Sequence, residues 1–173
     1  MRHVMIDLET FDTGPRAAII SIGACFFDPE TGEIGDKFHI GIDWNDAIKR
    51  GTVSGDTLRW WFAQEPSAIE RLLNLPTVPV ETALRDLSNF CGWANPYVWG
   101  NGSTFDITIL ENAYGRDQAP WKFWNTRDVR TVVHMARGIL EKDQISFEGV
   151  QHDALDDAIY QAKYVSEMWQ VLR

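Results

Sequence analysis

The chain has 173 residues, of which 45% are hydrophobic and 24% charged. This composition suits one globular, soluble domain spanning residues 1–173 and excludes disordered and fibrous proteins. The 16 Lys and Arg residues against 25 Asp and Glu give a net charge of −9, which excludes a broad basic face for unspecific binding of duplex nucleic acid or anionic membranes. A protein of this charge that handles nucleic acid needs another source of positive charge for the phosphates.

The two cysteines and the first residues indicate the compartment. Cys25 and Cys91 lie far apart in separate apolar runs, so neither a disulfide framework nor a Cys-based zinc site is expected, and a reducing compartment is favoured. Charged residues occur within the first seven positions, and no long apolar stretch follows, so neither a signal peptide nor a membrane span is predicted. We therefore expect a cytoplasmic protein with no membrane partner.

The first part of the chain predicts three strands. Residues 3–8 and 17–27 are apolar runs with β-branched members, separated by a turn that contains Gly14 and Pro15. A second turn at 28–32 leads into a stretch that alternates up to Ile42. This order is typical of an antiparallel meander.

The remainder of the chain alternates between helices and short strands. Apolar residues follow Ser54 at helical spacing, and Pro66 breaks or restarts that helix. Further helices are predicted after Pro79 and over residues 105–114, 129–140 and 153–172, with strands at 97–99 and 122–128. The prediction is an α/β fold with a mixed five-stranded sheet, made of the three-strand antiparallel meander plus two parallel strands, flanked by helices.

Asp7 and Glu9 lie at positions i and i+2 near the end of the first strand, so their side chains point to the same face of the sheet. Taken alone, this pair is as compatible with a solvated strand end as with a metal site. Because the strand is otherwise apolar and therefore expected to be central, two acids without a partner would be costly there. A shared cation is the favoured interpretation.

Two further acids are expected at the same place. Asp106 follows a buried strand where the chain enters a helix, so its side chain can reach the carboxyl edge of the sheet. Alternatively, it is an acid in the first turn of the helix that the helix dipole favours. In the last helix, Asp157 lies beside the apolar stripe and can face the sheet, whereas Asp156 points to water. Asp153 is placed to cap this helix.

Four carboxylates from two strand ends and two helices suit a pair of hard divalent ions, because Mg²⁺ prefers oxygen ligands. Two such ions about 3.5–4 Å apart can bind both oxygens of an in-line phosphoryl displacement. We expect two Mg²⁺ ions, with Mn²⁺ able to substitute. The ions would also supply the positive charge that the composition lacks.

Three segments together resemble known motifs: Asp7 to Glu9, Phe105-Asp106, and His152 to Asp157. They are similar to the three motifs of the DEDD, or DnaQ-like, 3′-to-5′ exonuclease superfamily, whose fold is RNase H-like. A histidine five residues before the last Asp resembles the histidine subtype, DEDDh. Residues 60–61 and 122–131 resemble the phage exonuclease A type and its bacterial exoribonuclease relatives. One departure is Gly102, where many members have Asn.

The resemblance implies the roles of the site residues. It implies that Asp7, Glu9, Asp106 and Asp157 hold two metals and that His152 is the general base, which agrees with an imidazole pKa of about 6.5. Residues expected to bind the substrate 3′ end are Leu8, Thr10, Phe11, Phe105 and Trp61.

Two questions about side chains stay open at this level. Trp60 and Trp61 cannot both face inward on one helix, so one of them is free to line the cleft. Arg127 and Arg130 suit phosphate contacts and an internal ion-pair network equally well.

The leading hypothesis is a metal-dependent 3′-to-5′ exonuclease on single-stranded DNA or RNA that releases nucleoside 5′-monophosphates, with DNA favoured by the nearer resemblance. The alternative from another class is a non-catalytic nucleic-acid or nucleotide-binding module of the same fold. A third hypothesis is an endonuclease. The sequence leaves room for a homodimer.

Overall fold

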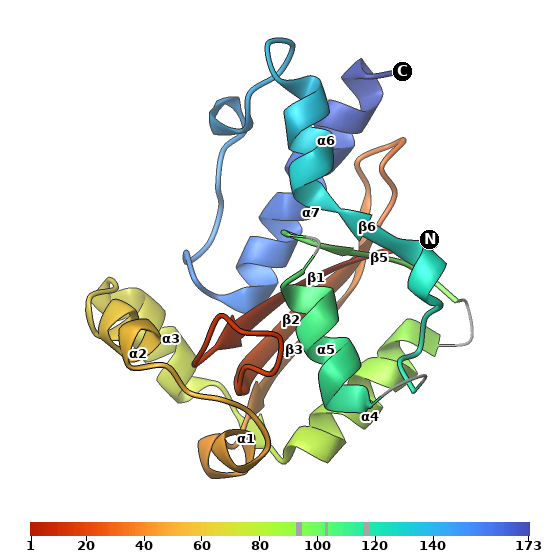
Figure 1. The fold of residues 1–173 in the computed structure, drawn as a ribbon. Helices are drawn as coiled ribbons and strands as arrows, with labels where there is room; N and C mark the ends of the chain where they lie inside the picture. The colour runs from red at the N-terminus through yellow and green to blue at the C-terminus, as the bar shows by residue number, and fades with distance from the viewer. Residues whose placement is uncertain (93–94, 103, 116–117) are drawn as a thin grey trace.

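A computed structural model describes residues 1–92, 95–102, 104–115 and 118–173. A central sheet with helices on both faces organises the chain (Figure 1). Its six strands lie in the order β4-β3-β2-β1-β5-β6. Their bounds are β1 His3–Thr10, β2 Ile19–Phe27, β3 Ile34–Ile42, β4 Thr77–Val78, β5 Tyr97–Gly100 and β6 Thr126–Asp128.

The meander and the parallel pair are confirmed, since β1, β2 and β3 pair antiparallel and β5 and β6 extend the sheet parallel to β1. The predicted count of five strands is wrong by one. The additional strand is β4, which pairs parallel with the end of β3 at Gly41 and Ile42. With only two residues between Pro76 and Pro79, β4 is too short for any alternation to be visible in the sequence.

Alternation along β1 separates the two cores. Val4 and Ile6 point into the core under α4 and α5, and Met5 points into the core under α6 and α7. Because side chains alternate along a strand, Asp7 and Glu9 continue the face of Met5. The first pair of acids therefore lies on the side of the sheet that α7 covers.

The helices form one layer on each face and a separate arm. In Figure 1 α2 and α3 form that arm, beside the beginning of α7. None of the described helices has the length and apolar character needed to span a membrane. The bounds are α1 Trp44–Arg50, α2 Gly55–Phe62, α3 Pro66–Asn74, α4 Val80–Cys91, α5 Asp106–Tyr114, α6 Val129–Ala136 and α7 Ala154–Val171.

Some boundaries differ from those that the sequence predicts. The helix α1 was not expected, although Asp43 caps it and Lys49 and Arg50 lie in its last turn. The expected strand at 122–128 begins with a 3₁₀ turn, η2 (Phe123–Asn125), before β6. A second 3₁₀ turn, η3 (Lys142–Gln144), lies between α6 and α7.

Gly23 in β2 allows α7 to approach the sheet. Gly23 is the direct neighbour of Asp7 in the sheet, and a Cβ at this position would lie 2.1 Å from the backbone carbon of Ala154. The first turn of α7 therefore rests on the backbone of β2, which brings Asp157 next to the end of β1.

Candidate active site

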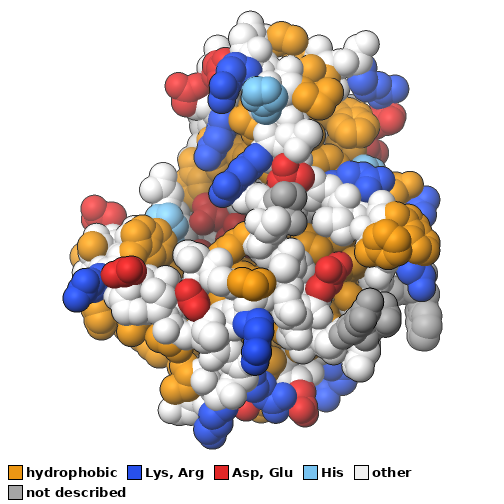
Figure 2. Space-filling view, viewed as in Figure 1, with side chains coloured by type: hydrophobic (Ala, Val, Ile, Leu, Met, Phe, Trp, Pro, Cys, Tyr) orange, Lys and Arg blue, Asp and Glu red, His pale blue; other side chains and the backbone are white. Residues whose placement is uncertain are grey.

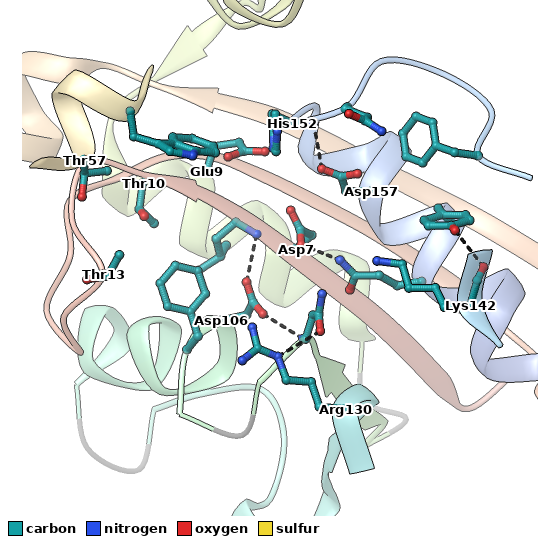
Figure 3. A pocket seen from close by; sticks show the side chains of 18 of the residues that line it. Asp7, Glu9, Thr10, Thr13, Thr57, Asp106, Arg130, Lys142, His152 and Asp157 are labelled. Carbon is teal, nitrogen blue, oxygen red and sulfur yellow. Dashed lines mark hydrogen bonds between the residues drawn. The ribbon is translucent and has the colours of Figure 1, made fainter. Parts of the chain in front are cut away.

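The carboxyl ends of β1 and β5 form the floor of a cavity of about 800 Å³ (Figure 3). The space-filling view shows this hollow with acidic side chains at its bottom and Lys and Arg side chains on its rim (Figure 2). All five residues predicted to be catalytic line it: Asp7, Glu9, Asp106, His152 and Asp157.

Asp106 is fixed by backbone donors from β1 and from the residue that follows β5. It is the first residue of α5 and only 1% exposed. The backbone N–H of Leu8 donates to Oδ1 at 3.2 Å, and that of Asn101 donates to Oδ2 at 3.0 Å. Burial raises the pKa of Asp106 to about 6, although these hydrogen bonds act in the opposite direction. Asp106 is thus held directly beside the segment that carries Asp7 and Glu9.

Asp157 is fixed by the turn that precedes α7. The backbone N–H of His152 donates to Asp157 Oδ2 at 2.9 Å, and His152 itself has a φ of 65°, in the left-handed region that non-glycine residues seldom adopt. Burial raises the pKa of Asp157 to about 6. This strained turn places the imidazole and the carboxylate on the same side of the cavity.

Glu9, His152 and Asp157 meet at one point. Each offers a ligand atom, and these atoms lie within 4.8 Å of one another. The sequence spaces these residues up to 148 positions apart, so the close approach is a product of the fold. This cluster is compatible with His152 either beside a metal ion or as a ligand of it.

The acids of the site lack positive partners. Burial, reinforced by the neighbouring acids, raises the pKa values of Asp7 and Glu9 well above their usual range. Among the residues that the structure describes, none of the four site acids forms an ion pair with Lys or Arg. A group of four carboxylates without an ion-pair partner in this described part of the chain fits a hard divalent cation.

Asp153 has the structural role that the sequence predicts. It caps α7 by accepting from the backbone N–H groups of Leu155 and Asp156 through Oδ1. Its other oxygen accepts from Arg71 Nε of α3 at 2.8 Å. This carboxylate, which is 4% exposed, therefore attaches the α2–α3 arm to the beginning of α7.

The predicted substrate-binding residues divide into two groups. Leu8, Thr10 and Phe105 line the cavity, whereas Phe11 and Trp61 do not.

Of the tryptophan pair, the residue that faces the cleft is Trp60, which corrects the expectation for Trp61. Trp60 is 43% exposed and lies edge-on to the His152 ring, with 4.8 Å between centroids. Trp61 is 6% exposed and donates its Nε1 to the backbone oxygen of Thr10 at 3.0 Å. Phe11 is likewise buried, with its ring packed against Trp44.

Sequence reasoning missed several residues of the cavity. Gln161 lies one helical turn beyond Asp157, a spacing that would have indicated it. Lys142 belongs to a segment without periodicity, so no sequence signal indicated it. The other lining residues that were missed come from predicted helices as well as from loops, and are Thr13, Ser54, Asp56, Thr57, Phe147, Gln151, Tyr160 and Tyr164.

Comparison with known proteins agrees with this geometry. Residues 2–169 match the family model described as the 3′-5′ exoribonuclease Rv2179c-like domain. The chain belongs to this family. It is a 3′-5′ exonuclease, and the resemblance to the DEDD superfamily is confirmed.

Other known proteins are similar to this chain over most of its length. The exodeoxyribonuclease of Enterobacteria phage T4 is 26% identical over 212 aligned positions, which cover 100% of this chain and 90% of the phage protein. A solved nuclease domain of 3′hExo, a DEDDh family member bound to rAMP, has a TM-score of 0.63 and 16% identity, covering 98% of this chain and 92% of that one.

Two other solved structures share the fold. S. pombe Pop2p with bound Mg²⁺ and Mn²⁺ has a TM-score of 0.62 and 15% identity, with 96% of this chain and 82% of that one covered. Exonuclease I has a TM-score of 0.66 and 14% identity, with 98% of this chain and 42% of that one covered. The RNase H-like fold predicted from the motifs is confirmed.

Proposed function

We propose that this exonuclease shortens single-stranded nucleic acid from the 3′ end with the aid of two divalent metal ions, Mg²⁺ or Mn²⁺, and releases nucleoside 5′-monophosphates. The observation that carries the proposal is the meeting of Glu9, His152 and Asp157 within 4.8 Å, beside Asp7 and Asp106. Support for metal use also comes from S. pombe Pop2p, which was solved with Mg²⁺ and Mn²⁺.

The proposed ligands are Asp7, Glu9, Asp106 and Asp157. A pair of divalent ions would supply positive charge that activates water and stabilises the departing 3′ oxygen. Asp106 and Asp157 contribute orientation as well as charge, because backbone N–H groups fix their carboxylates before any ion binds. The carboxylates of Asp106 and Asp157 are therefore already oriented in the metal-free site.

His152 is proposed to take the proton from the attacking water. Burial lowers the pKa of His152 below its usual value, so the imidazole is neutral and able to accept a proton at neutral pH. The edge-on contact with Trp60 restricts the orientation of the ring.

The terminal nucleotide is proposed to lie against Leu8, Thr10, Phe105 and Trp60, which line the cavity and offer two aromatic walls. Stacking of a base on an aromatic side chain contributes about 1–3 kcal/mol with little preference for the base. The family description names an exoribonuclease and the phage relative is an exodeoxyribonuclease. The expected preference for DNA therefore gains no support over RNA, and we propose single strands of either sugar as substrates.

A degradation time course tests the proposal. Matched deoxy- and ribo-oligonucleotides with a 3′ or a 5′ label are incubated with Mg²⁺, Mn²⁺ or EDTA. We expect the 3′ label to be released first as a nucleoside 5′-monophosphate, only with a metal ion, and we expect circular single strands to stay intact. Cleavage of circles would establish an endonuclease instead.

The proposed role of His152 has its own test. We expect His152→Ala to lower kcat by about 10²–10⁴-fold, the usual contribution of a general base, while the affinity for Mn²⁺ measured by calorimetry changes little. The exposed His134 provides the control, since His134→Ala should change neither quantity. An equal loss of Mn²⁺ affinity in His152→Ala would instead identify His152 as a metal ligand.

A further inference from the structure

Two cations share the cavity with the acids. Arg130 lies in the first turn of α6 and Lys142 begins the turn η3, and both line the cavity. In Figure 3 they lie on the side of Asp7 that faces away from Glu9 and His152. The cavity therefore has an imidazole side and a cationic side.

Neither cation is neutralised within the described part of the chain. Arg130 donates from Nε to Asn101 Oδ1 at 3.3 Å, a neutral acceptor, and forms no ion pair with a described acid. The Lys142 ammonium lies over the rings of Tyr160 and Tyr164, 5.6 and 5.5 Å from their centroids. Aromatic faces attract a cation without cancelling its charge. The charge of Arg130 lowers the pKa of Asp106 and that of Lys142 lowers the pKa of Asp157. Because neither cation is held in an ion pair with a described acid, both can also contact an anionic ligand in the cavity.

Arg127 differs from Arg130 although only three residues separate them. Its guanidinium lies 4.5 Å from the Tyr97 ring centroid and donates to the backbone oxygens of Trp124 and Thr126. It is not among the residues that line the cavity. Of the two arginines that the sequence left undecided, Arg130 alone is placed to meet substrate.

We propose that Arg130 and Lys142 together bind the phosphodiester next to the scissile one, on its 5′ side, in a single strand whose 3′ end lies in the cavity. This inference rests on the proposed function and specifies how the strand runs across the site. The scissile phosphate lies over the acids and their ions, with the terminal nucleotide toward Trp60 and His152. The next phosphate then reaches the opposite side, where Arg130 and Lys142 lie.

The overall charge explains why such a pair is needed. The chain carries a net charge of −9, so the part of the strand beyond the metal ions would otherwise be repelled. Metal ions can neutralise the reacting phosphate only. An Arg and a Lys facing the cavity supply local attraction where the ions do not reach.

The test compares substrates with and without a second phosphate. The 4-nitrophenyl ester of thymidine 5′-monophosphate has only the scissile phosphodiester, whereas a short oligonucleotide also has the next one. We expect Arg130→Gln and Lys142→Gln each to lower kcat/KM about tenfold or more on the oligonucleotide, the effect of one lost charged hydrogen bond. The loss on the ester should be at least fivefold smaller.

The controls are Arg127→Gln and Lys122→Gln, which remove the same charges outside the cavity. They should lower oligonucleotide turnover less than twofold. Equal losses of Arg130→Gln on ester and oligonucleotide would overturn the proposal, because the cation would then act on the scissile phosphate. The proposal would also be overturned if Arg127→Gln and Lys122→Gln lowered kcat/KM on the oligonucleotide as much as Arg130→Gln and Lys142→Gln do.

Binding without turnover separates this inference from the proposed function. The affinity for a labelled oligonucleotide is measured by fluorescence anisotropy in Ca²⁺ at several salt concentrations. We expect each variant to weaken binding about tenfold and to reduce the slope of log K against log salt concentration by about 0.7, the value for one phosphate contact on a single strand. Unchanged binding would overturn the proposal even in an active enzyme. Binding that depends on Arg130 in a protein that hydrolyses no substrate would support the phosphate site and refute the proposed function.

Discussion

Gln161 donates its side-chain Nε2 to Asp7 Oδ1 at 2.7 Å. This bond joins the helix of the third motif directly to the strand of the first. Gln161 is 5% exposed, and its Oε1 has no donor within the part of the chain that the structure describes. Burial and the neighbouring Asp106 and Asp157 raise the pKa of Asp7. The hydrogen bond from Gln161 acts in the opposite direction, because a neutral donor stabilises the charged form of the carboxylate. Gln161 is therefore a positioning residue for the central carboxylate.

Replacing Gln161 by Met keeps the volume and removes the donor. We expect activity at limiting Mg²⁺ to fall about 10–100-fold, as is usual when the hydrogen-bond partner of a metal ligand is lost. Because Asp7 then holds its proton more tightly, the Mg²⁺ concentration for half-maximal rate should rise most at low pH. Titrations of the rate with Mg²⁺ at pH 6 and pH 8 measure this.

The exposed Gln170 on the same helix supplies the matched control, and Gln170→Met should leave both titrations unchanged. A purely structural role of Gln161 predicts a loss that is independent of pH and Mg²⁺. That result would contradict the assignment.

The positions of the site acids could be predicted from the sequence, because periodicity determines on which face of a strand or helix a side chain lies. Alternation along β1 placed Asp7 and Glu9 together, and the stripe of α7 placed Asp157 toward the sheet. The orientation of the tryptophan pair depends on how the α2–α3 arm packs. In the structure, Arg71 of α3 attaches this arm to Asp153, and a contact across 82 positions leaves no local pattern.

The metal-free site should destabilise the fold at neutral pH. The pKa values of Asp106 and Asp157 are raised to about 6, and those of Asp7 and Glu9 are raised well above their usual range. The folded state therefore binds protons more tightly than the unfolded state. Above about pH 6, where the four acids are charged, they lower the free energy of unfolding. The cost disappears as the pH falls toward the ordinary carboxyl values near 4.

Asp7→Asn tests this cost, because it removes one charge and keeps an acceptor for Gln161. We expect the variant to be inactive, and in EDTA at pH 7.5 to be more stable than the parent by about 1 kcal/mol, or about 2–4 °C in Tm. At pH 5 the difference should shrink. Mg²⁺ should raise the Tm of the parent more than that of the variant, and calorimetry measures all three effects. A variant less stable than the parent at pH 7.5 would contradict the electrostatic account.

Gly23→Val tests the contact that brings the two motifs together. A side chain here would collide with the backbone of Ala154, so the first turn of α7 must move away from β2. We expect a loss of activity of more than 100-fold, because displacements of about 1 Å at a reacting centre have effects of this size, together with a lower Tm. Steady-state rates and thermal unfolding measure the two effects.

The control is Gly55→Ala at the beginning of α2, where an added Cβ meets no atom within 4 Å. This variant should keep its activity and its stability. An active Gly23→Val enzyme would show that α7 reaches its position by other contacts.

Trp60→Ala tests how the wall of the cavity controls the general base. Burial lowers the pKa of His152, and the Trp60 ring, 4.8 Å from the imidazole centroid, is part of what covers it. Without this ring water reaches the imidazole, so the pKa of His152 rises toward its usual value near 6.5. The acid limb of the kcat/KM profile should then move to higher pH, because the base is lost by protonation at a higher pH.

The same substitution removes a stacking surface, so KM for oligonucleotides should rise as well. The pH profile separates the two effects. Lost stacking lowers kcat/KM equally at every pH, whereas a changed pKa of His152 moves the acid limb of the profile. The control is Trp124→Ala, whose ring is 61% exposed and does not line the cavity; it should move neither quantity. A limb that stays in place in Trp60→Ala would assign Trp60 to substrate binding alone and leave the low pKa of His152 to the rest of the cavity wall.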